Sequence, residues 1–285
     1  MLCWTFAGCL GMLILGHTSH CHDAELVEVG KLKAVILDLD GCVYVGERPV
    51  DGAATAIAEL RRMGYRILFL TNNSTLSRAG YVDKLNRMGI KAEEKEMLTS
   101  GMATSKYIYD VYGPSRILAV TEEGFVEEAR LMGHTVVPLE RFHEASIVVV
   151  GLDRGFNYQK LRAAARAIIS GAKFIATNED RTLPTETGPD PGAGSIVAAV
   201  KAVTGVEPIV IGKPSKIIVN MALEILNVRS DEAVLVGDKL ETDIRAAASA
   251  GMPSVLISRT EPLGYPRPDF VLSSIRLLPR LLSRR

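Results

Sequence analysis

The sequence predicts an α/β fold in which a doubly wound parallel sheet carries an inserted second α/β domain. Three observations lead to this prediction. Short apolar runs bounded by turn residues alternate with helical patterns, the alternation starts afresh after the break at Gly113-Pro114, and polar residues follow several of the runs, where parallel sheets bind ligands. The 285 residues, 47% of them apolar, suffice for one large or two ordinary domains.

The first part of the chain contains three predicted strand–helix pairs. The stretch 35–41 is an apolar run that ends in acids and a glycine, which predicts a strand buried on both faces. Ser77 is a suitable N-cap, and glycines close two of the helices. The later strands are predicted at 66–70 and 97–98, and the helices at 53–63, 78–88 and 102–112.

The middle of the chain repeats the same alternation with enough apolar residues for a small core of its own. Strands are predicted at 117–120, 135–137, 147–150 and 174–176, and helices at 123–131, 158–169 and 196–203. Residues 177–194 read as a long loop, and long loops in compact domains tend to be functional.

From Pro208 the first pattern resumes. The predicted strands are 209–211, 233–236, 254–257 and an edge strand at 269–272, and the predicted helices are 217–226, 244–250 and an amphipathic tail at 276–285. The chain is therefore divided into a leader at 1–30, a core made of 31–113 and 208–285, and an inserted cap at 114–207.

Composition argues against nucleic acid and membrane as partners. The 33 basic and 33 acidic residues balance to a formal charge of zero, whereas a nucleic-acid binder normally carries a basic surplus. The apolar run at 2–16 is short for a membrane-spanning helix. Cys42 stands alone in the body of the chain, so we expect a packing role for it and a reducing, cytoplasmic setting.

The leader lacks the positive region of a secretory signal, because no Lys or Arg precedes Lys31. We expect residues 1–30 to be disordered, or the start of the sequence to be set too far upstream, with the true start near Val27 or Val29. Secretion, with residues 1–20 as a signal peptide, is the alternative.

Two acids, Asp38 and Asp40, stand at the end of the first predicted strand. Residues i and i+2 of a strand project to the same side, so both carboxylates are expected together at the carboxyl edge of the sheet. Two close carboxylates repel each other, and in the ionised form they need a cation or a proton beside them. The pair therefore indicates a Mg²⁺-assisted nucleophile with an acid/base, and a solvated surface turn is the alternative.

Three further polar groups follow predicted strands, namely Thr71-Asn72-Asn73, Lys213 and Asp238. Taken alone, they could be turn residues, a solvated lysine before a helix, and a helix cap. Taken together, they supply a hydroxyl with amides, a cation and a third acid. Phosphoryl transfer needs this set beside a nucleophile.

The whole set, in this order, resembles the haloacid dehalogenase superfamily of phosphatases. Its four motifs are similar to Asp38-Leu39-Asp40-Gly41, Thr71-Asn72-Asn73, Lys213, and Gly237-Asp238 with Thr242-Asp243-Ile244. The insertion resembles the α/β cap of subclass IIA, which contains NagD-type nucleotide phosphatases, pyridoxal phosphate and phosphoglycolate phosphatases, and nitrophenylphosphatases. The resemblance covers about residues 31–275, and Thr-Asn-Asn-Ser at 71–74 and 191–195 are particularly like that subclass.

The resemblance implies a Mg²⁺-dependent phosphatase that acts on a small phosphorylated metabolite through an aspartyl-phosphate. Asp38 would be the nucleophile and Asp40 the acid/base. Mg²⁺ would be held by Asp38, the main-chain carbonyl of Asp40, and Asp238. Lys213 would keep Asp38 ionised. The phosphoryl group would be bound by Thr71, Asn72, Asn73 and Lys213.

The cap is expected to close over the site and to contact the leaving group. In its loop, Asn178, Asp180 and Arg181 would reach the non-phosphate part of the substrate, or else only shape the loop. His134 and His143 have no carboxylate or cysteine partners at ligand spacing, so we expect them at the surface or at an interface. Cap-to-cap dimers are common in the resembling family, which makes a homodimer one expectation.

Two other functions remain open at this point. A phospho-accepting receiver domain also combines an acidic pair, a Thr and a Lys on a doubly wound sheet, but the chain length and the insertion argue against it. A non-catalytic sugar-phosphate binder would not need the intact acids. The sequence leaves the substrate open among phosphoglycolate, nucleotides, pyridoxal phosphate and sugar phosphates.

Overall fold

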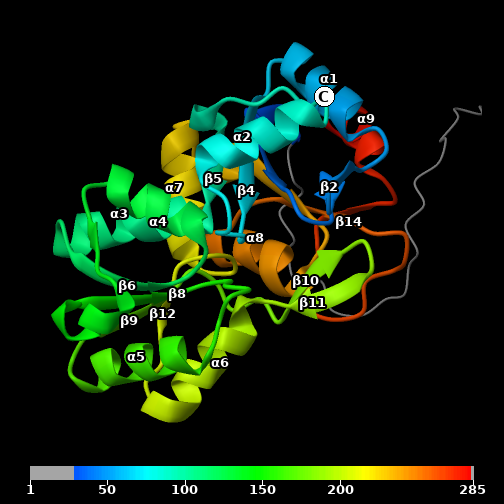
Figure 1. Ribbon diagram of the computed structural model, residues 1–285. Coiled ribbons are helices and arrows are strands. Elements are labelled where there is room, and N and C mark those ends of the chain that lie inside the picture. Colours follow the sequence, from blue (N-terminus) through cyan, green and yellow to red (C-terminus); the bar gives the residue numbers. More distant parts are fainter. Residues whose placement is uncertain (1–28, 284–285) are drawn as a thin grey trace, which may run out of the picture.

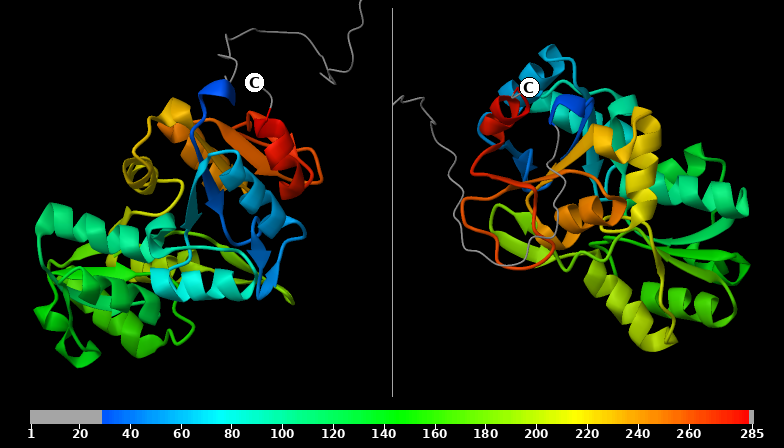
Figure 2. Two further views of the ribbon diagram at one scale, coloured as in Figure 1. Left: turned by 90° about the horizontal axis from the view of Figure 1, so that it is seen from above. Right: turned by 180° about the vertical axis from the view of Figure 1, so that it is seen from behind.

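The computed structural model describes residues 29–283 (Figure 1). The predictions for residues 1–28, including the signal-peptide alternative, lie outside these residues, as does the end of the predicted tail helix. Two parallel sheets with helices packed on their faces make up the described chain, which confirms the α/β class (Figure 2). No helix among residues 29–283 has the length and apolar character needed to cross a bilayer.

The first sheet has six parallel strands in the order β15-β14-β13-β1-β4-β5. Every residue of β1 is buried, as the apolar run predicted. The neighbours β4 and β13 flank β1 on opposite sides, which makes the carboxyl end of β1 the point where doubly wound sheets bind ligands. The strand bounds are β1 Ala34–Asp38, β4 Arg66–Thr71, β5 Met97–Thr99, β13 Ala233–Gly237, β14 Ser254–Ile257 and β15 Phe270–Leu272.

Helices cover both faces of this sheet because successive side chains of a strand point to opposite faces. Val35 and Leu37 pack with α1, α2 and α9, whereas Ala34 and Ile36 pack with α7 and α8. The predicted N-cap Ser77 accepts a main-chain hydrogen bond at the start of α2. The helix bounds are α1 Ala53–Arg62, α2 Arg78–Arg87, α7 Lys216–Leu226, α8 Arg245–Ala250 and α9 Leu278–Leu282. After β1, a short hairpin joins β2 (Tyr44–Val45) to β3 (Arg48–Pro49).

The second sheet has five parallel strands in the order β12-β9-β8-β6-β7. Helices α3 and α4 pack on one face, and α5 and α6 pack on the other (Figure 1). The strand bounds are β6 Arg116–Val120, β7 Thr135–Val136, β8 Ile147–Val150, β9 Lys173–Ala176 and β12 Ile209–Val210. The helix bounds are α3 Ser100–Tyr112, α4 Glu123–Leu131, α5 Tyr158–Ile169 and α6 Ala193–Thr204.

One apolar layer belongs to both sheets. It contains Ile36 and Leu70 of the first sheet together with Ile147 and Val149 of the second, and buried residues of α3, α4, α7 and α8 complete it. We call this cluster the shared layer. The two sheets are therefore packed on a common core and are not merely connected by the chain that runs between them.

The strand at Ile209–Val210 differs from its prediction. The sequence assigned it to the resumed core, but β12 pairs in parallel with β9 of the second sheet, with Ile209 opposite Ile175. The insertion thus continues through Val210, beyond the expected end at 207. The remaining boundaries of the core and cap stay a prediction.

The segment 177–194 is not the structureless loop that the sequence predicts. Inside it, β10 (Thr182–Thr185) pairs with β11 (Gly188–Pro191) as an antiparallel hairpin. Helix α6 also begins at Ala193, earlier than the expected residue 196. The hairpin reaches toward the first sheet, where it borders the cavity described below.

His134 is buried, so its prediction as a surface or interface residue is wrong. Its Nδ1 accepts the N–H of Ser115 at 3.1 Å, and its Nε2 lies 3.0 Å from the carbonyl oxygen of Ser105. The ring thus satisfies two buried main-chain groups between α3 and the start of β6. A buried polar ring with both nitrogens partnered is a structural element of the fold.

Candidate active site

Three predicted site residues converge at the carboxyl edge of the first sheet. Asp38 ends β1, Thr71 ends β4, and Asp238 directly follows β13. In the strand register, Asp38 lies opposite Leu70, and Leu37 lies opposite Val236. The convergence follows from strand order, since neighbouring parallel strands end at the same edge.

Three carboxylates meet at this edge. Asp38, Asp238 and Asp243 each present an oxygen, and these oxygens all lie within 4.8 Å of one another. Gly41 permits the approach, because a Cβ at that position would lie 2.2 Å from the Asp238 Oδ2, and its φ of +99° favours glycine. Within the described chain, the Asp238 Oδ1 is buried without a hydrogen-bond partner. An acid cluster with an orphaned oxygen fits a divalent cation that prefers oxygen ligands.

The electrostatics of the cluster also call for a cation. Burial, together with the neighbouring Asp243, raises the pKa of Asp238 to about 6. Burial raises the pKa of Asp38 well above its usual range, although Lys213 opposes the shift. Both shifts reflect the cost of carrying several negative charges out of water, which an added positive charge would relieve.

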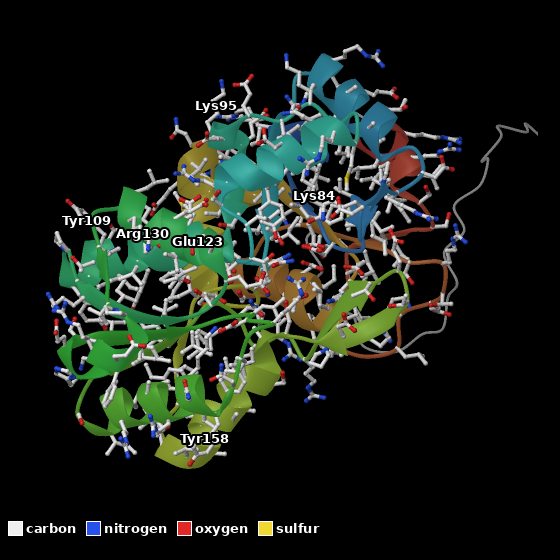
Figure 3. The ribbon with its side chains drawn as sticks, in the orientation of Figure 1. Lys84, Lys95, Tyr109, Glu123, Arg130 and Tyr158 are labelled. Carbon is white, nitrogen blue, oxygen red and sulfur yellow. The ribbon has the colours of Figure 1, made fainter. Side chains whose placement is uncertain are left out.

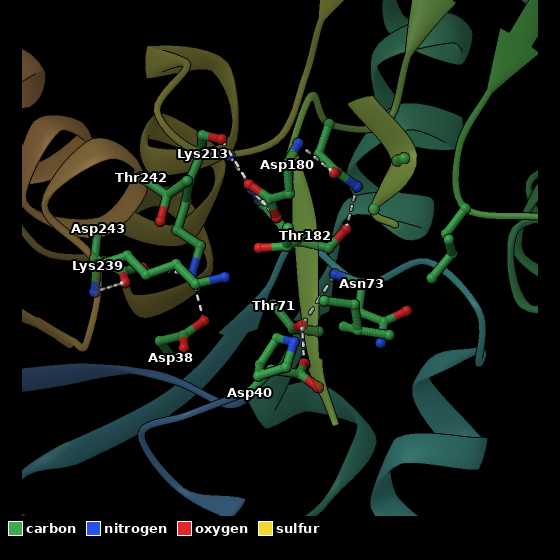
Figure 4. Close-up of a pocket in the computed structure, with 17 residues that line it drawn as sticks. Asp38, Asp40, Thr71, Asn73, Asp180, Thr182, Lys213, Lys239, Thr242 and Asp243 are labelled. Atoms are coloured by element: carbon green, nitrogen blue, oxygen red, sulfur yellow. Dashed lines mark hydrogen bonds and ion pairs between the residues drawn. The ribbon is translucent and has the colours of Figure 1, made fainter. Parts of the chain in front are cut away.

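Lys213 supplies one positive charge to the cluster. Its Nζ lies 2.5 Å from the Asp38 Oδ1 and 2.7 Å from the Asp243 Oδ1, and all three side chains are buried (Figure 4). Burial alone would lower the pKa of Lys213, but Asp243 and Asp38 outweigh burial and raise that pKa above its ordinary value. Lys213 therefore stays charged, and the plainer interpretation of a solvated lysine is wrong.

Asp40 also lines the cavity and lies against Thr71. Its Oδ2 accepts the Thr71 hydroxyl at 3.1 Å and the Tyr44 hydroxyl at 3.3 Å. The Thr71 oxygen in turn accepts the N–H of Asn73 at 3.0 Å (Figure 4). Burial raises the pKa of Asp40, while Lys84 and Thr71 lower it less. A carboxyl whose pKa is raised by burial is suited to proton donation.

The side chains of Asn72 and Asn178 bind protein groups. The Asn72 amide spans the Lys213 peptide, accepting its N–H at 2.7 Å and donating to its carbonyl at 2.8 Å. The Asn178 Nδ2 donates to the Asn72 carbonyl at 2.6 Å, and its Oδ1 accepts the N–H of Asp180 at 3.0 Å. Asn72 also donates to the Asp180 carboxylate at 3.2 Å. These bonds tie the segment before the hairpin to the main chain that carries Lys213.

Asp243, a residue of the recognised fourth motif, joins the cluster through Lys213. A π-helical turn at Leu240–Ile244 turns the chain back after β13. The Asp243 Oδ2 accepts the N–H of Lys239 at 3.1 Å, which fixes the carboxylate toward Lys213. Gly237 leaves room for this, because a Cβ there would lie 2.2 Å from the Asp243 Cγ. The sequence signals for it were the motif Thr242-Asp243-Ile244 and an acid five residues after Asp238.

A cavity opens beside these groups. Asp38, Asp40, Asp243 and Lys213 line one side of it. The opposite wall comes from the chain after β8 and β9 and from the β10–β11 hairpin (Figure 4). Asp180 lines the cavity, whereas Arg181 is exposed and does not. The rest of the lining includes Leu152, Thr182, Leu183, Pro184, Ala193 and Lys239. The hairpins β2–β3 and β10–β11 approach each other at the exposed pair Arg48–Glu186, 3.6 Å apart.

Comparison with known proteins gives matches along most of the chain. A family model described as haloacid dehalogenase-like hydrolase matches residues 35–135, and a second HAD-hydrolase-like model matches residues 210–278. An acid sugar phosphatase of Staphylococcus saprophyticus is 38% identical over 223 residues, which cover 78% of this chain and 85% of that protein. A 5′-nucleotidase of Bacillus subtilis is 36% identical over 225 residues, covering 79% and 86%.

Solved structures agree with the sequence relatives. The p-nitrophenyl phosphatase from Archaeoglobus fulgidus superimposes with a TM-score of 0.81 at 32% identity, covering 88% of this chain and 99% of that one. Sequence and fold thus point to the same group of enzymes. The chain belongs to the haloacid dehalogenase-like hydrolases, among the subclass IIA phosphatases, which hydrolyse phosphate monoesters.

Proposed function

We propose that the protein is a Mg²⁺-dependent phosphatase of a small phosphorylated metabolite and acts through an aspartyl-phosphate on Asp38. The observation that carries the proposal is the meeting of Asp38, Asp238 and Asp243 within 4.8 Å, with Lys213 bonded to two of them. Asp40 at the cavity favours turnover, because a phosphatase needs a proton donor for the leaving oxygen and a receiver domain or an idle binder does not.

The residues that would hold Mg²⁺ are Asp38, Asp238 and the main-chain carbonyl of Asp40. The Asp243 carboxylate is bonded to Lys213 and to the Lys239 N–H, so its role is to fix Lys213 beside the site. Bound there, Mg²⁺ would offset the repulsion between the anionic nucleophile and an anionic phosphate.

The reaction divides into two displacements at phosphorus. A carboxylate oxygen of Asp38 bonds to phosphorus as the bond to the leaving oxygen breaks, and Asp40 gives its proton to that oxygen. Asp40 then takes a proton from water as the water oxygen attacks the aspartyl-phosphate, which releases phosphate and restores Asp38. Thr71, Asn73 and Lys213 would hold the transferring phosphoryl group.

The side chains of Asn72 and Asn178 take positioning roles in this proposal. Their amides are already bonded to the Lys213 peptide and to the Asn72 carbonyl, so neither is open to a substrate. Of the two roles considered for Asn178, shaping the loop has the better support. Asp180 is the loop residue that faces the cavity.

The wall of the cavity supports a leaving group that carries hydroxyls. Asp180 is a partly buried acid bonded to Asn72, and it would repel a second anionic group while accepting hydroxyl hydrogens. Leu152 and Leu183 offer apolar contacts beside it. A sugar phosphate fits this lining, in keeping with the acid sugar phosphatases among the relatives. Phosphoglycolate, whose leaving group carries a carboxylate, fits it less well.

A screen of phosphorylated metabolites with Mg²⁺, run beside an EDTA control, tests the proposal. We expect release of inorganic phosphate from p-nitrophenyl phosphate and from sugar phosphates, with sugar phosphates preferred over phosphoglycolate. EDTA is expected to abolish the release, and added Mg²⁺ to restore it. Full activity in EDTA would contradict the metal, and a phosphorylated protein that never turns over would indicate a receiver. The cytoplasmic setting and the homodimer through the cap stay predictions.

Replacing Asp238 with asparagine is expected to weaken Mg²⁺ binding by at least about tenfold, because the site loses one charged ligand. Isothermal calorimetry with Mg²⁺ alone measures this without relying on turnover. Asp110→Asn is the matched control, since Asp110 is exposed on α3 and pairs only with Lys106. Equal Mg²⁺ affinity in the Asp238 variant and the wild type would remove Asp238 from the site.

A further inference from the structure

The two carboxyl oxygens of Asp40 are in different surroundings. The Oδ2 accepts both the Tyr44 and the Thr71 hydroxyls, at 3.3 and 3.1 Å. The other oxygen, Oδ1, takes no hydrogen bond from any residue in 29–283. Asp40 is partly exposed and lines the cavity, so Oδ1 is the oxygen left for a bound substrate.

Tyr44 is firmly held behind Asp40. Its side chain is fully buried in β2, and the ammonium of Lys84 lies 4.3 Å from the centre of its ring. Lys84, which reaches this ring from α2, is itself paired with Glu47 at 2.9 Å (Figure 3). Burial and the nearby Asp40 raise the pKa of the Tyr44 hydroxyl, so it remains a donor. Because the Tyr44 ring is buried and Lys84 lies over its face, the position of its hydroxyl oxygen is fixed.

Thr71 cannot serve Asp40 throughout the reaction. A hydroxyl has one hydrogen to donate, and Thr71 donates it to the Asp40 Oδ2. With the Asn73 N–H, the Thr71 oxygen is the acceptor. In the proposed function, the same hydroxyl binds the transferring phosphoryl group. Once the Thr71 hydroxyl donates its hydrogen bond to the phosphoryl group, it no longer donates to Asp40. Tyr44 is then the remaining side-chain donor to Asp40 in the described chain.

We propose that Tyr44 is the positioning residue of Asp40: its hydroxyl holds Oδ2, so that the proton passed to the leaving oxygen is the one on Oδ1. This inference rests on the proposed function. As phosphorus bonds to Asp38 and releases the leaving oxygen, the electron pair of the broken P–O bond takes the Oδ1 proton. Asp40 then remains as a carboxylate, with its charge stabilised by the Tyr44 hydroxyl.

Tyr44→Phe removes only the hydroxyl, and its effect should depend on the leaving group. We compare p-nitrophenyl phosphate with phenyl phosphate, which share a ring but differ in how much their phenolate needs a proton. Leaving-group release is followed in a single turnover with Mg²⁺ and excess enzyme, so that later hydrolysis does not contribute. The rate for phenyl phosphate is expected to fall roughly tenfold, a part of what general acid catalysis supplies. The rate for p-nitrophenyl phosphate should stay within about twofold, because its leaving group needs little protonation.

Tyr65→Phe is the matched control, because the Tyr65 hydroxyl donates to the Leu282 carbonyl at the opposite edge of the sheet. We expect it to leave both rates unchanged. An equal fall for both esters in Tyr44→Phe would mean a merely structural role and would overturn the inference, as would no fall for either. If these results accompany an inactive Asp38→Asn, the proposed function stands and the inference alone fails. Turnover that survives in Asp38→Asn overturns both.

Discussion

Asp38→Asn is expected to reduce turnover by about 10⁴-fold or more, because the amide cannot form the aspartyl-phosphate on which both displacements depend. The fold should survive, since the substitution keeps the shape of the side chain and removes one of three crowded carboxylates. Asp243 still pairs with Lys213 in this variant, so the lysine keeps a partner.

Steady-state hydrolysis of p-nitrophenyl phosphate measures this effect, and circular dichroism with thermal melting checks the fold. Asp110→Asn changes the same functional group on the exposed face of α3 and should retain wild-type turnover. A folded Asp38→Asn that hydrolyses the ester at a rate comparable to wild type would refute Asp38 as the nucleophile.

Lys213→Met is expected to impair both catalysis and stability. The substitution keeps most of the apolar length but leaves Asp38 and Asp243 buried without their cation, and breaking a buried ion pair in this way costs about 3–5 kcal/mol of unfolding free energy. Turnover should fall by at least about 10²-fold, because the transferring phosphoryl group loses a positive charge.

Chemical denaturation in EDTA and in Mg²⁺ separates the two effects. Mg²⁺ should raise the stability of the variant more than that of the wild type, because the ion restores positive charge to the acids. Lys106→Met breaks an exposed pair with Asp110 and should cost no more than about 1 kcal/mol. A Lys213→Met protein as stable as the wild type in EDTA would show that the buried acids do not depend on this lysine.

Local patterns predicted most of the fold because most of its elements are specified locally. β1 and β8 are short apolar runs, and α5 follows an Asn cap with helical spacing. The assignment of β12 failed for a physical reason, since two residues can pair with either sheet and only the distant β9 decides. The hairpin β10–β11 was missed because its prolines and glycine also suit a loop, whereas a two-stranded edge tolerates them.

The site was predictable to the extent that it depends on strand ends. Asp38, Thr71 and Asp238 each end or follow a strand, so sheet order alone brings them together. Other contacts depend on turns that no short pattern reveals. Asp243 returns to the cluster through a π-helical turn, and Tyr44 reaches Asp40 only because the chain doubles back directly after β1.

The shared layer stabilises the placement of the two sheets that border the cavity. Tilting one sheet away from the other would expose this layer to water, at about 25 cal/mol for each Å² of apolar surface. The exposed Arg48–Glu186 pair between the two hairpins adds little to this, because such pairs contribute about 0–1 kcal/mol. Apolar burial between the sheets therefore fixes the walls of the cavity far more strongly than the contact between the hairpins does.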